Sequence, residues 1–233
     1  APSSHALSPG EMLRDLQVIM EGAYQPSHPG SLAHLDPPPL TASIIGDLIC
    51  SGLNNNLLAE ELSPSLSRLE RQLCNWFAKR LGLPEEAGGV AASGGTLSNL
   101  MALVVARQHA HLQHDSKAVV LASRDAHVSF AKAVRVMGLP SDSLQLVNTS
   151  SEGGISLRSL EENLNLLRQS GKKCFAVVAT AGTTVRGAVD PLTEIANICR
   201  REGVWLHVDG AIGGIFALTK PNPIFLKGLS NAN

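Results

Sequence analysis

The sequence predicts an α/β protein built on a mostly parallel β-sheet with helices on both faces, preceded by a helical N-terminal segment. Two observations support this prediction. From about residue 88, short apolar runs typical of strands alternate with longer segments that have helical periodicity. The last of these runs, 204–208, consists mostly of β-branched or bulky residues and follows a helical pattern closed by Gly203, which indicates a buried strand.

Residues 1–62 are expected to form the N-terminal segment, which is partly helical and partly irregular. Ser8–Glu11 has the pattern of a capping box with proline at the first helical position, so a helix is expected from there to about Glu21. Residues 22–39 are rich in Pro, Gly and His, and three consecutive prolines exclude a helix or a central strand there. A second helix is predicted over residues 41–53.

Residues 63–233 are expected to form the α/β domain. Its first helix starts at Ser63 and Pro64, carries apolar residues on one face and stops near Gly82. The elements that follow are predicted as strands over 89–92, 117–122, 144–147, 174–179 and 204–208, and as helices over 97–108, 126–137, 156–169 and 190–201. In such a sheet, ligands bind outside the carboxyl ends of the strands.

Composition and charge argue against several classes of partner. The 233 residues carry a net charge of −1 and no basic cluster, which argues against nucleic acid. No apolar run is long enough to span a membrane, and the N-terminus does not have the pattern of a signal peptide. The 4 cysteines are widely spaced without a CxxC pair, so they are interpreted as buried free thiols in a reducing compartment, the cytoplasm.

A glycine-rich turn after the first predicted strand is a candidate phosphate cup. Ser93, Gly94, Gly95 and Thr96 open a helix, and the two glycines allow backbone N–H groups to approach an anion closely. The helix N-terminus adds partial positive charge, and the hydroxyls add donors. An ordinary turn before a helix explains the same residues, and the pattern is neither GxGxxG nor a Walker loop.

Polar residues also follow three later strands. His127 follows the second predicted strand and either stacks on a ligand or transfers a proton, or else caps the next helix. Thr180 follows the fourth strand in a loop of Thr and Gly, which either bonds a polar ligand or is an ordinary loop. Asp209 follows the last strand, before the small residues Gly210 and Ala211, and is either a ligand-binding carboxylate or a turn or cap aspartate.

Together these groups fit pyridoxal phosphate. The cup would hold the phosphate and an aromatic ring would stack on the pyridine. A carboxylate would keep the pyridine nitrogen protonated, which makes the ring an electron sink. A nicotinamide cofactor would need a different glycine loop and a ribose-binding acid about 20 residues further on.

Four motifs resemble those of the group II pyridoxal-phosphate decarboxylases, which include the glutamate, aromatic amino acid, cysteine sulfinate and diaminobutyrate decarboxylases. In order, they are Ser93-Gly-Gly-Thr-Leu-Ser-Asn-Leu-Met-Ala-Leu-Val-Val-Ala-Arg107, Ser123-Arg-Asp-Ala-His127, Val178-Ala-Thr-Ala-Gly-Thr-Thr184 and Trp205-Leu-His-Val-Asp209. Upstream, similar segments are His34-Leu-Asp-Pro-Pro38, Leu53-Asn-Asn-Asn56 and Leu62-Ser-Pro64. The likeness covers nearly the whole chain and implies a fold-type-I domain, of which residues 63–233 would be the N-terminal part.

The resemblance implies decarboxylation of an L-amino acid by a pyridoxal-phosphate-dependent homodimer without a metal. His127 would stack on the pyridine ring and help return a proton. Asp209 would pair with the pyridine nitrogen, Thr180 would lie near the ring substituents, and Ala211 would pack under the ring. The residues that the resemblance assigns to the cofactor are Ser93, Gly94, Gly95, Thr96, His127, Thr180, Asp209 and Ala211.

The family's Schiff-base lysine normally lies well beyond this aspartate, in a His-Lys pair. Lys220 and Lys227 come too early and have no preceding histidine. The chain is therefore interpreted as a fragment whose Schiff-base lysine is expected past Asn233.

Other interpretations stay open. A fold-type-I aminotransferase or lyase would use the same cofactor, although the upstream segment argues against it, and a truncated relative could be non-catalytic. His109, His111 and His114 suggest a metal, but no acidic or thiol ligand completes a set. His207 lies inside a predicted strand and is interpreted as a hydrogen-bonded core histidine. The motifs do not discriminate between amino-acid substrates.

Overall fold

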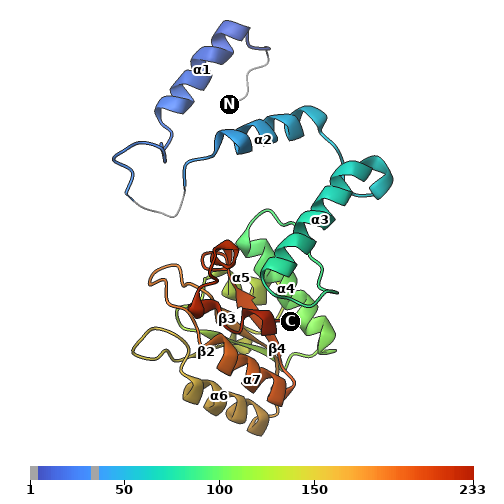
Figure 1. Cartoon of the computed structure of the whole chain (residues 1–233), viewed down its shortest axis with the longest axis vertical. Helices are drawn as coiled ribbons and strands as arrows, with labels where there is room; N and C mark the ends of the chain where they lie inside the picture. The colour runs from blue at the N-terminus through green and yellow to red at the C-terminus, as the bar shows by residue number, and fades with distance from the viewer. Residues whose placement is uncertain (1–4, 33–36) are drawn as a thin grey trace. The chain divides into compact units, whose positions relative to one another are not determined.

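The computed structural model describes residues 5–32 and 37–233 (Figure 1). The chain divides into two compact units, Ala1–Ser63 and Pro64–Asn233. His34, Leu35 and Asp36 of the upstream motif lie outside the described residues.

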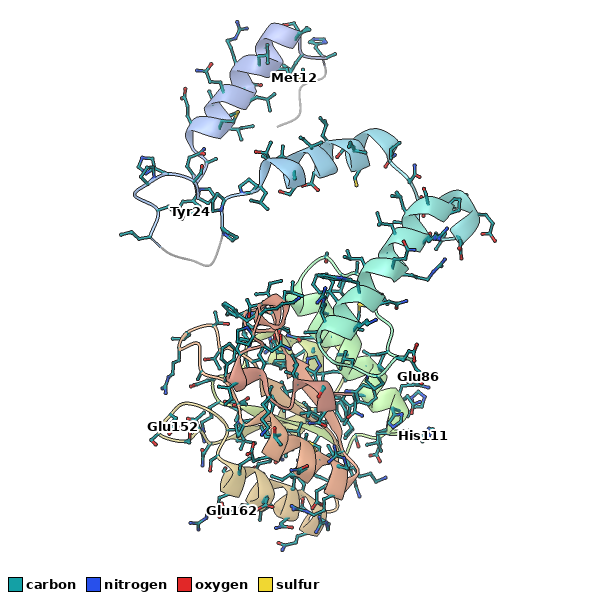
Figure 2. All side chains as sticks on the ribbon, in the orientation of Figure 1. Met12, Tyr24, Glu86, His111, Glu152 and Glu162 are labelled. Carbon is teal, nitrogen blue, oxygen red and sulfur yellow. The ribbon has the colours of Figure 1, made fainter. Side chains whose placement is uncertain are left out.

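The first unit contains α1 (Pro9–Glu21), α2 (Thr41–Leu53) and the short 3-10 helix η1 (Glu60–Leu62). The capping box predicted at the start of α1 is confirmed. Glu11 N donates to Ser8 Oγ over 3.4 Å, and Ser8 N donates to Glu11 Oε2 over 2.8 Å. The predicted bounds of α2 are confirmed as well. Side chains of both helices are largely exposed, as Figure 2 shows for Met12 on α1.

The second unit is an α/β sandwich, which confirms the predicted fold class. Within the described residues its sheet has four strands in the order β2-β1-β3-β4, and every neighbouring pair is parallel. The elements are α3 (Pro64–Arg80), α4 (Gly95–His109), β1 (Ala118–Ser123), α5 (Ser129–Val136), η2 (Ser141–Ser143), β2 (Leu144–Val147), α6 (Leu157–Gln169), β3 (Lys173–Thr180), α7 (Leu192–Glu202), β4 (Trp205–Asp209), η3 (Gly214–Leu218), η4 (Ile224–Leu226) and η5 (Leu229–Asn231).

Helices cover both faces of this sheet because successive strand residues point to opposite sides. One face packs against α6 and α7 in a cluster that includes Leu121, Val177, Leu160 and Ile195. The other face packs against α4 and α5 in a cluster that includes Val120, Val178, Leu103 and Phe130. Glu162 on α6 projects away from the sheet in Figure 2.

The predicted strand over 89–92 does not form. A strand is stabilised by pairing with a neighbour, and this segment joins none of the sheet's strands in the described structure. Ala91 N instead donates to Glu70 Oε1 on α3 over 2.9 Å. The side chain of Val90 is 63% exposed, so the segment also lacks the burial that its composition suggested.

Two helices begin at least two residues later than predicted. α5 begins at Ser129 because Ala126 N donates to Ser123 O in a turn and His127 Nδ1 accepts from Ser129 N. α7 begins at Leu192, and Asp190 is not its cap: the carboxylate of Asp190 bonds backbone groups elsewhere in the fold.

All four cysteines are free, as predicted, but only Cys199 is fully buried: Cys74 and Cys174 are half-buried, and Cys50 lies exposed on α2. Burial raises the pKa of Cys174 and of Cys199 to about 12, so both thiols stay protonated and unreactive near neutral pH. Across residues 5–32 and 37–233, none of the helices has the length and apolar character needed to cross a membrane.

Candidate functional site

The carboxyl edge of the sheet brings Thr180 and Asp209 together. Each is the last residue of its strand, and the two are partners in the parallel register of β3 and β4. Beyond them the two strands stay joined, because Ala181 N donates to Asp209 O over 2.9 Å and Gly213 N donates to Ala181 O over 2.8 Å. Two of the predicted site residues therefore lie side by side.

The glycine turn reaches the same edge. An ideal Cβ built on Gly95 would lie 4.0 Å from the Cβ of Ala211, two residues past the end of β4, so α4 begins beside Asp209. A Cβ on Gly94 would meet no atom within 4 Å, which leaves open space in front of the turn. Within the described part of the chain, the N–H groups of Gly95 and Thr96 bond no acceptor, as expected for the first turn of a helix without a side-chain cap.

The carboxylate of Asp209 is held from two directions. Oδ1 accepts from Ala211 N over 3.1 Å, and Oδ2 accepts from Asn99 Nδ2 on α4 over 3.0 Å. Asp209 is only partly buried, so the carboxylate remains accessible from the edge. Its fixed position beside the first turn of α4 puts a negative group next to a set of unbonded donors.

His127 is linked to Asn99 by hydrogen bonds that pass through Ser129. It is exposed in the turn before α5, and its Nδ1 accepts from Ser129 N over 3.2 Å. Ser129 Oγ accepts in turn from Asn99 Nδ2 over 3.0 Å. Because Nδ1 is an acceptor, the neutral ring carries its proton on Nε2.

Thr180 contributes an unsatisfied hydroxyl. Its Oγ1 is buried, and among the described residues it has no hydrogen-bond partner. Its backbone N–H donates to Asp190 Oδ2 over 2.7 Å, and Asp190 Oδ1 accepts from Ile155 N over 2.7 Å. Asp190 thus ties the end of β3 to the segment before α6, and burial raises the pKa of its carboxyl.

Sequence reasoning missed Asn99 as a member of this site. A signal was present: Asn99, Leu103 and Ala106 recur at helical spacing, and these are the buried residues of α4. A polar residue in a buried stripe needs a partner, and that partner is Asp209. Asp190 was also missed. Its position directly before Pro191 gave no sign that its carboxylate ties the end of β3 to the segment before α6.

The interpretation of His207 as a bonded core histidine is confirmed. Its Nε2 lies 2.9 Å from Asn99 Oδ1, and its ring meets Phe130 edge-on with centroids 5.8 Å apart. Burial lowers the pKa of His207 to about 4, although the nearby charge of Asp209 acts in the opposite direction.

Acid is expected to destabilise the fold through His207. Between its folded pKa of about 4 and its ordinary value of 6.5, the unfolded chain binds a proton that the folded chain does not. Stability should therefore fall as the pH drops through this window, by roughly 2 kcal/mol at pH 5. Denaturant midpoints at pH 7 and pH 5 measure this loss, and His207→Gln, which cannot titrate, should reduce it.

Asp190 opposes part of the same loss, because its raised pKa makes the folded state take up a proton before the unfolded state does. Both proteins contain Asp190, so its contribution cancels when the pH dependence of stability in the wild type is compared with that in His207→Gln. Equal pH dependence in the two proteins would contradict the prediction.

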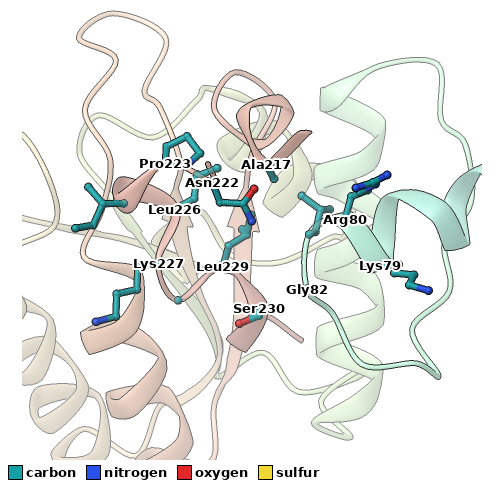
Figure 3. Close-up of a pocket in the computed structure, with 13 residues that line it drawn as sticks. Lys79, Arg80, Gly82, Ala217, Asn222, Pro223, Leu226, Lys227, Leu229 and Ser230 are labelled. Carbon is teal, nitrogen blue, oxygen red and sulfur yellow. The ribbon is translucent and has the colours of Figure 1, made fainter. Parts of the chain in front are cut away.

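A cavity of about 680 Å³ opens elsewhere, between the end of α3 and residues 217–230 (Figure 3). Lys79 and Arg80 line one side, and Leu226 and Lys227 line the other. None of the predicted site residues lines this cavity. The candidate site is therefore the open carboxyl edge, not the cavity.

The comparisons with known proteins agree on one family. The model of the pyridoxal-dependent decarboxylase conserved domain matches residues 4–233. The chain is 37% identical to an aromatic-L-amino-acid decarboxylase of Bacillus atrophaeus over 207 residues, which are 88% of this chain and 43% of that protein. It is 33% identical to an L-2,4-diaminobutyrate decarboxylase of Rhizobium meliloti over 92% of this chain and 43% of that protein.

Solved structures give the same answer for the fold. Mouse CSAD in its apo form has a TM-score of 0.93 at 28% identity, covering 100% of this chain and 50% of that one. A glutamate decarboxylase domain from Vibrio parahaemolyticus has a TM-score of 0.92 at 28% identity, covering 100% of this chain and 54% of that one. The chain thus spans about half the length of the relatives it matches.

Proposed function

Because the chain belongs to the pyridoxal-dependent decarboxylase family, we propose that the protein containing it binds pyridoxal 5′-phosphate and converts an L-amino acid to its amine and CO2. The observation that carries the proposal is the position of the Asp209 carboxylate, beside the unbonded first N–H groups of α4 at the carboxyl edge of the sheet. A carboxylate and an anion-binding turn at one edge suit a ligand with a phosphate at one end and a cationic ring at the other.

The residues present fit this cofactor. Open space in front of Gly94 and the free N–H groups of Gly95 and Thr96 would hold the phosphate, with Ser93 completing the turn. The orphaned Thr180 hydroxyl would find its partner on the ring substituents, since a buried hydroxyl without a partner is costly. When bound, the cofactor supplies a protonated ring that accepts electrons as the carboxyl group leaves.

Asp209 and His127 have the chemical roles in this proposal. Asp209 would hold a proton on the pyridine nitrogen, while Ala211 supports the ring from below. His127 would stack on the ring, and with Nδ1 accepting from Ser129 N the neutral ring would offer Nε2–H as a hydrogen-bond donor. It would return a proton only from its imidazolium form, in which Nδ1 no longer accepts from Ser129 N. Its exposed position leaves the ring free to make both contacts.

The homodimer and the cytoplasmic location are further parts of the proposal. Exposed apolar side chains on α1 and α2, such as Leu13 and Leu48, support association with a second subunit. The free thiols support a reducing compartment.

The test is an assay of the full-length protein, loaded with pyridoxal phosphate, against a panel of L-amino acids. Equal amounts of CO2 and amine are expected for at least one substrate. A keto acid without CO2 would indicate an aminotransferase instead. No product and no cofactor binding would mean that the protein is a non-catalytic relative.

The phosphate cup can be tested separately through charge. Gly94→Glu is expected to weaken pyridoxal phosphate binding by at least about tenfold, because like charges a few ångströms apart near a protein surface repel by up to roughly 4 kcal/mol. Gly94→Ala is the matched control, since an added Cβ meets no atom within 4 Å. Absorbance titrations of the apo proteins measure both affinities. Equal affinities for the two variants would place the phosphate elsewhere.

A further inference from the structure

Asn99 is a buried polar residue with every part of its amide engaged. It lies one turn into α4 and is 5% exposed. Its Nδ2 donates to Asp209 Oδ2 and to Ser129 Oγ, each over 3.0 Å, and its Oδ1 lies 2.9 Å from His207 Nε2. The amide therefore links α4 to α5 and to two residues of β4.

The direction of this amide follows from its neighbours. The Asp209 carboxylate only accepts hydrogen bonds, so Asn99 must present Nδ2 to it. Asn99 Oδ1 then faces His207, whose Nε2 must carry a proton to donate. Turning the amide over would set two oxygens against each other at one end and two N–H groups at the other. The Asp209 carboxylate thus selects one orientation of the amide, and His207 in its neutral Nε2–H form bonds the amide only in that orientation.

The selected orientation fixes Asp209. Ala211 N holds Oδ1 from the same loop, and Asn99 holds Oδ2 from a separate helix. Two donors on different elements prevent the carboxylate from rotating about its Cβ–Cγ bond. An electrostatic partner contributes most to a reaction when its orientation is set in advance.

We propose that Asn99 is a positioning residue for Asp209, and that His207 acts through Asn99 by fixing the direction of its amide. This inference rests on the proposed function, because it assigns a purpose to the orientation of Asp209. His207, Asn99 and Asp209 then act as one unit.

The experiment is a double-mutant cycle on the full-length protein, read out by the affinity of the apo protein for pyridoxal phosphate and by kcat. Asn99→Leu keeps the side-chain volume and removes the donor. It is expected to weaken cofactor binding and to lower kcat by roughly tenfold or more, as removal of an outer-shell partner typically does. Asn163→Leu is the control, because Asn163 is a half-buried amide on α6, and it should change neither value by more than about twofold.

The decisive measurement uses the Asp209→Ala background. If Asn99 acts through Asp209, Asn99→Leu changes the cofactor affinity of that background by less than about twofold. Equal weakening in both backgrounds would show that Asn99 only supports the fold and would overturn the proposal.

His207 gives an independent test in case Asn99→Leu does not fold. Glutamine can donate to Asn99 Oδ1 and leucine cannot, so His207→Gln should bind the cofactor more tightly and turn over faster than His207→Leu. Equal values for these two variants would overturn the role of His207. A wild type without cofactor binding or CO2 release would count against the proposed function, whereas an active wild type with an additive cycle would count only against this inference.

Discussion

Asp209→Asn in the full-length protein is expected to lower kcat by about 10²-fold or more while destabilising the folded state by no more than about 1–3 kcal/mol, because the new NH2 group faces one of the two N–H donors that hold the carboxylate. The substitution keeps the shape of the side chain and removes its charge. A preorganised electrostatic partner typically contributes on the order of 10²-fold or more to turnover. Asp209 lies at the end of β4 and is partly exposed, so its loss leaves no cavity in either apolar cluster.

Turnover and urea midpoints should be measured on the same preparations. Asp142→Asn is the control, because this exposed carboxylate pairs with Lys172 at the surface and lies away from the site residues. It should stay within about twofold of the wild type in kcat, since surface ion pairs contribute little. Normal turnover in Asp209→Asn would contradict the role assigned to the carboxylate.

Gly213→Ala is expected to destabilise the fold by about 1–3 kcal/mol or more. A Cβ at this position would lie 2.1 Å from Ala181 O and 2.8 Å from Ala181 C, both of which are backbone atoms and cannot move aside as a side chain would. Relief of the clash would break the 2.8 Å hydrogen bond from Gly213 N to Ala181 O. That bond joins the segments that follow β3 and β4, so cofactor affinity should fall with stability.

Gly214→Ala is the matched control one residue away. An added Cβ there meets nothing within 4 Å, so its stability should stay within about 0.5 kcal/mol of the wild type. Urea midpoints of the two variants measure the difference. Similar midpoints would mean that the backbone around Ala181 yields more easily than its packing indicates.

The sequence predicted most helices and strands because their signals are local. Serine caps, prolines at the first turn and apolar periodicity marked the beginning of α1, α3 and α6 within one residue. The strand expected over 89–92 failed for the opposite reason, since pairing with a neighbour depends on residues far away along the chain.

The residues of the candidate site were likewise predictable only where the signal is local. Strand ends could be located from the sequence, so Thr180 and Asp209 were found together at one edge. The contact between Asn99 and Asp209 joins residues 110 positions apart, and that between His207 and Asn99 joins residues 108 apart. Contacts of this kind depend on how α4 packs on β4, which periodicity alone does not specify.

The pairing of Thr180 with Asp209 limits where insertions and deletions can be tolerated. Removing one residue from the interior of β3 would turn Thr180 to the opposite face and exchange the residues that the two apolar clusters receive. The exposed residues 184–187 carry no such constraint, because they lie between the bridged residues Ala181 and Val189 and outside both clusters. Changes of length are therefore expected in that loop, where they would not shift the strand register.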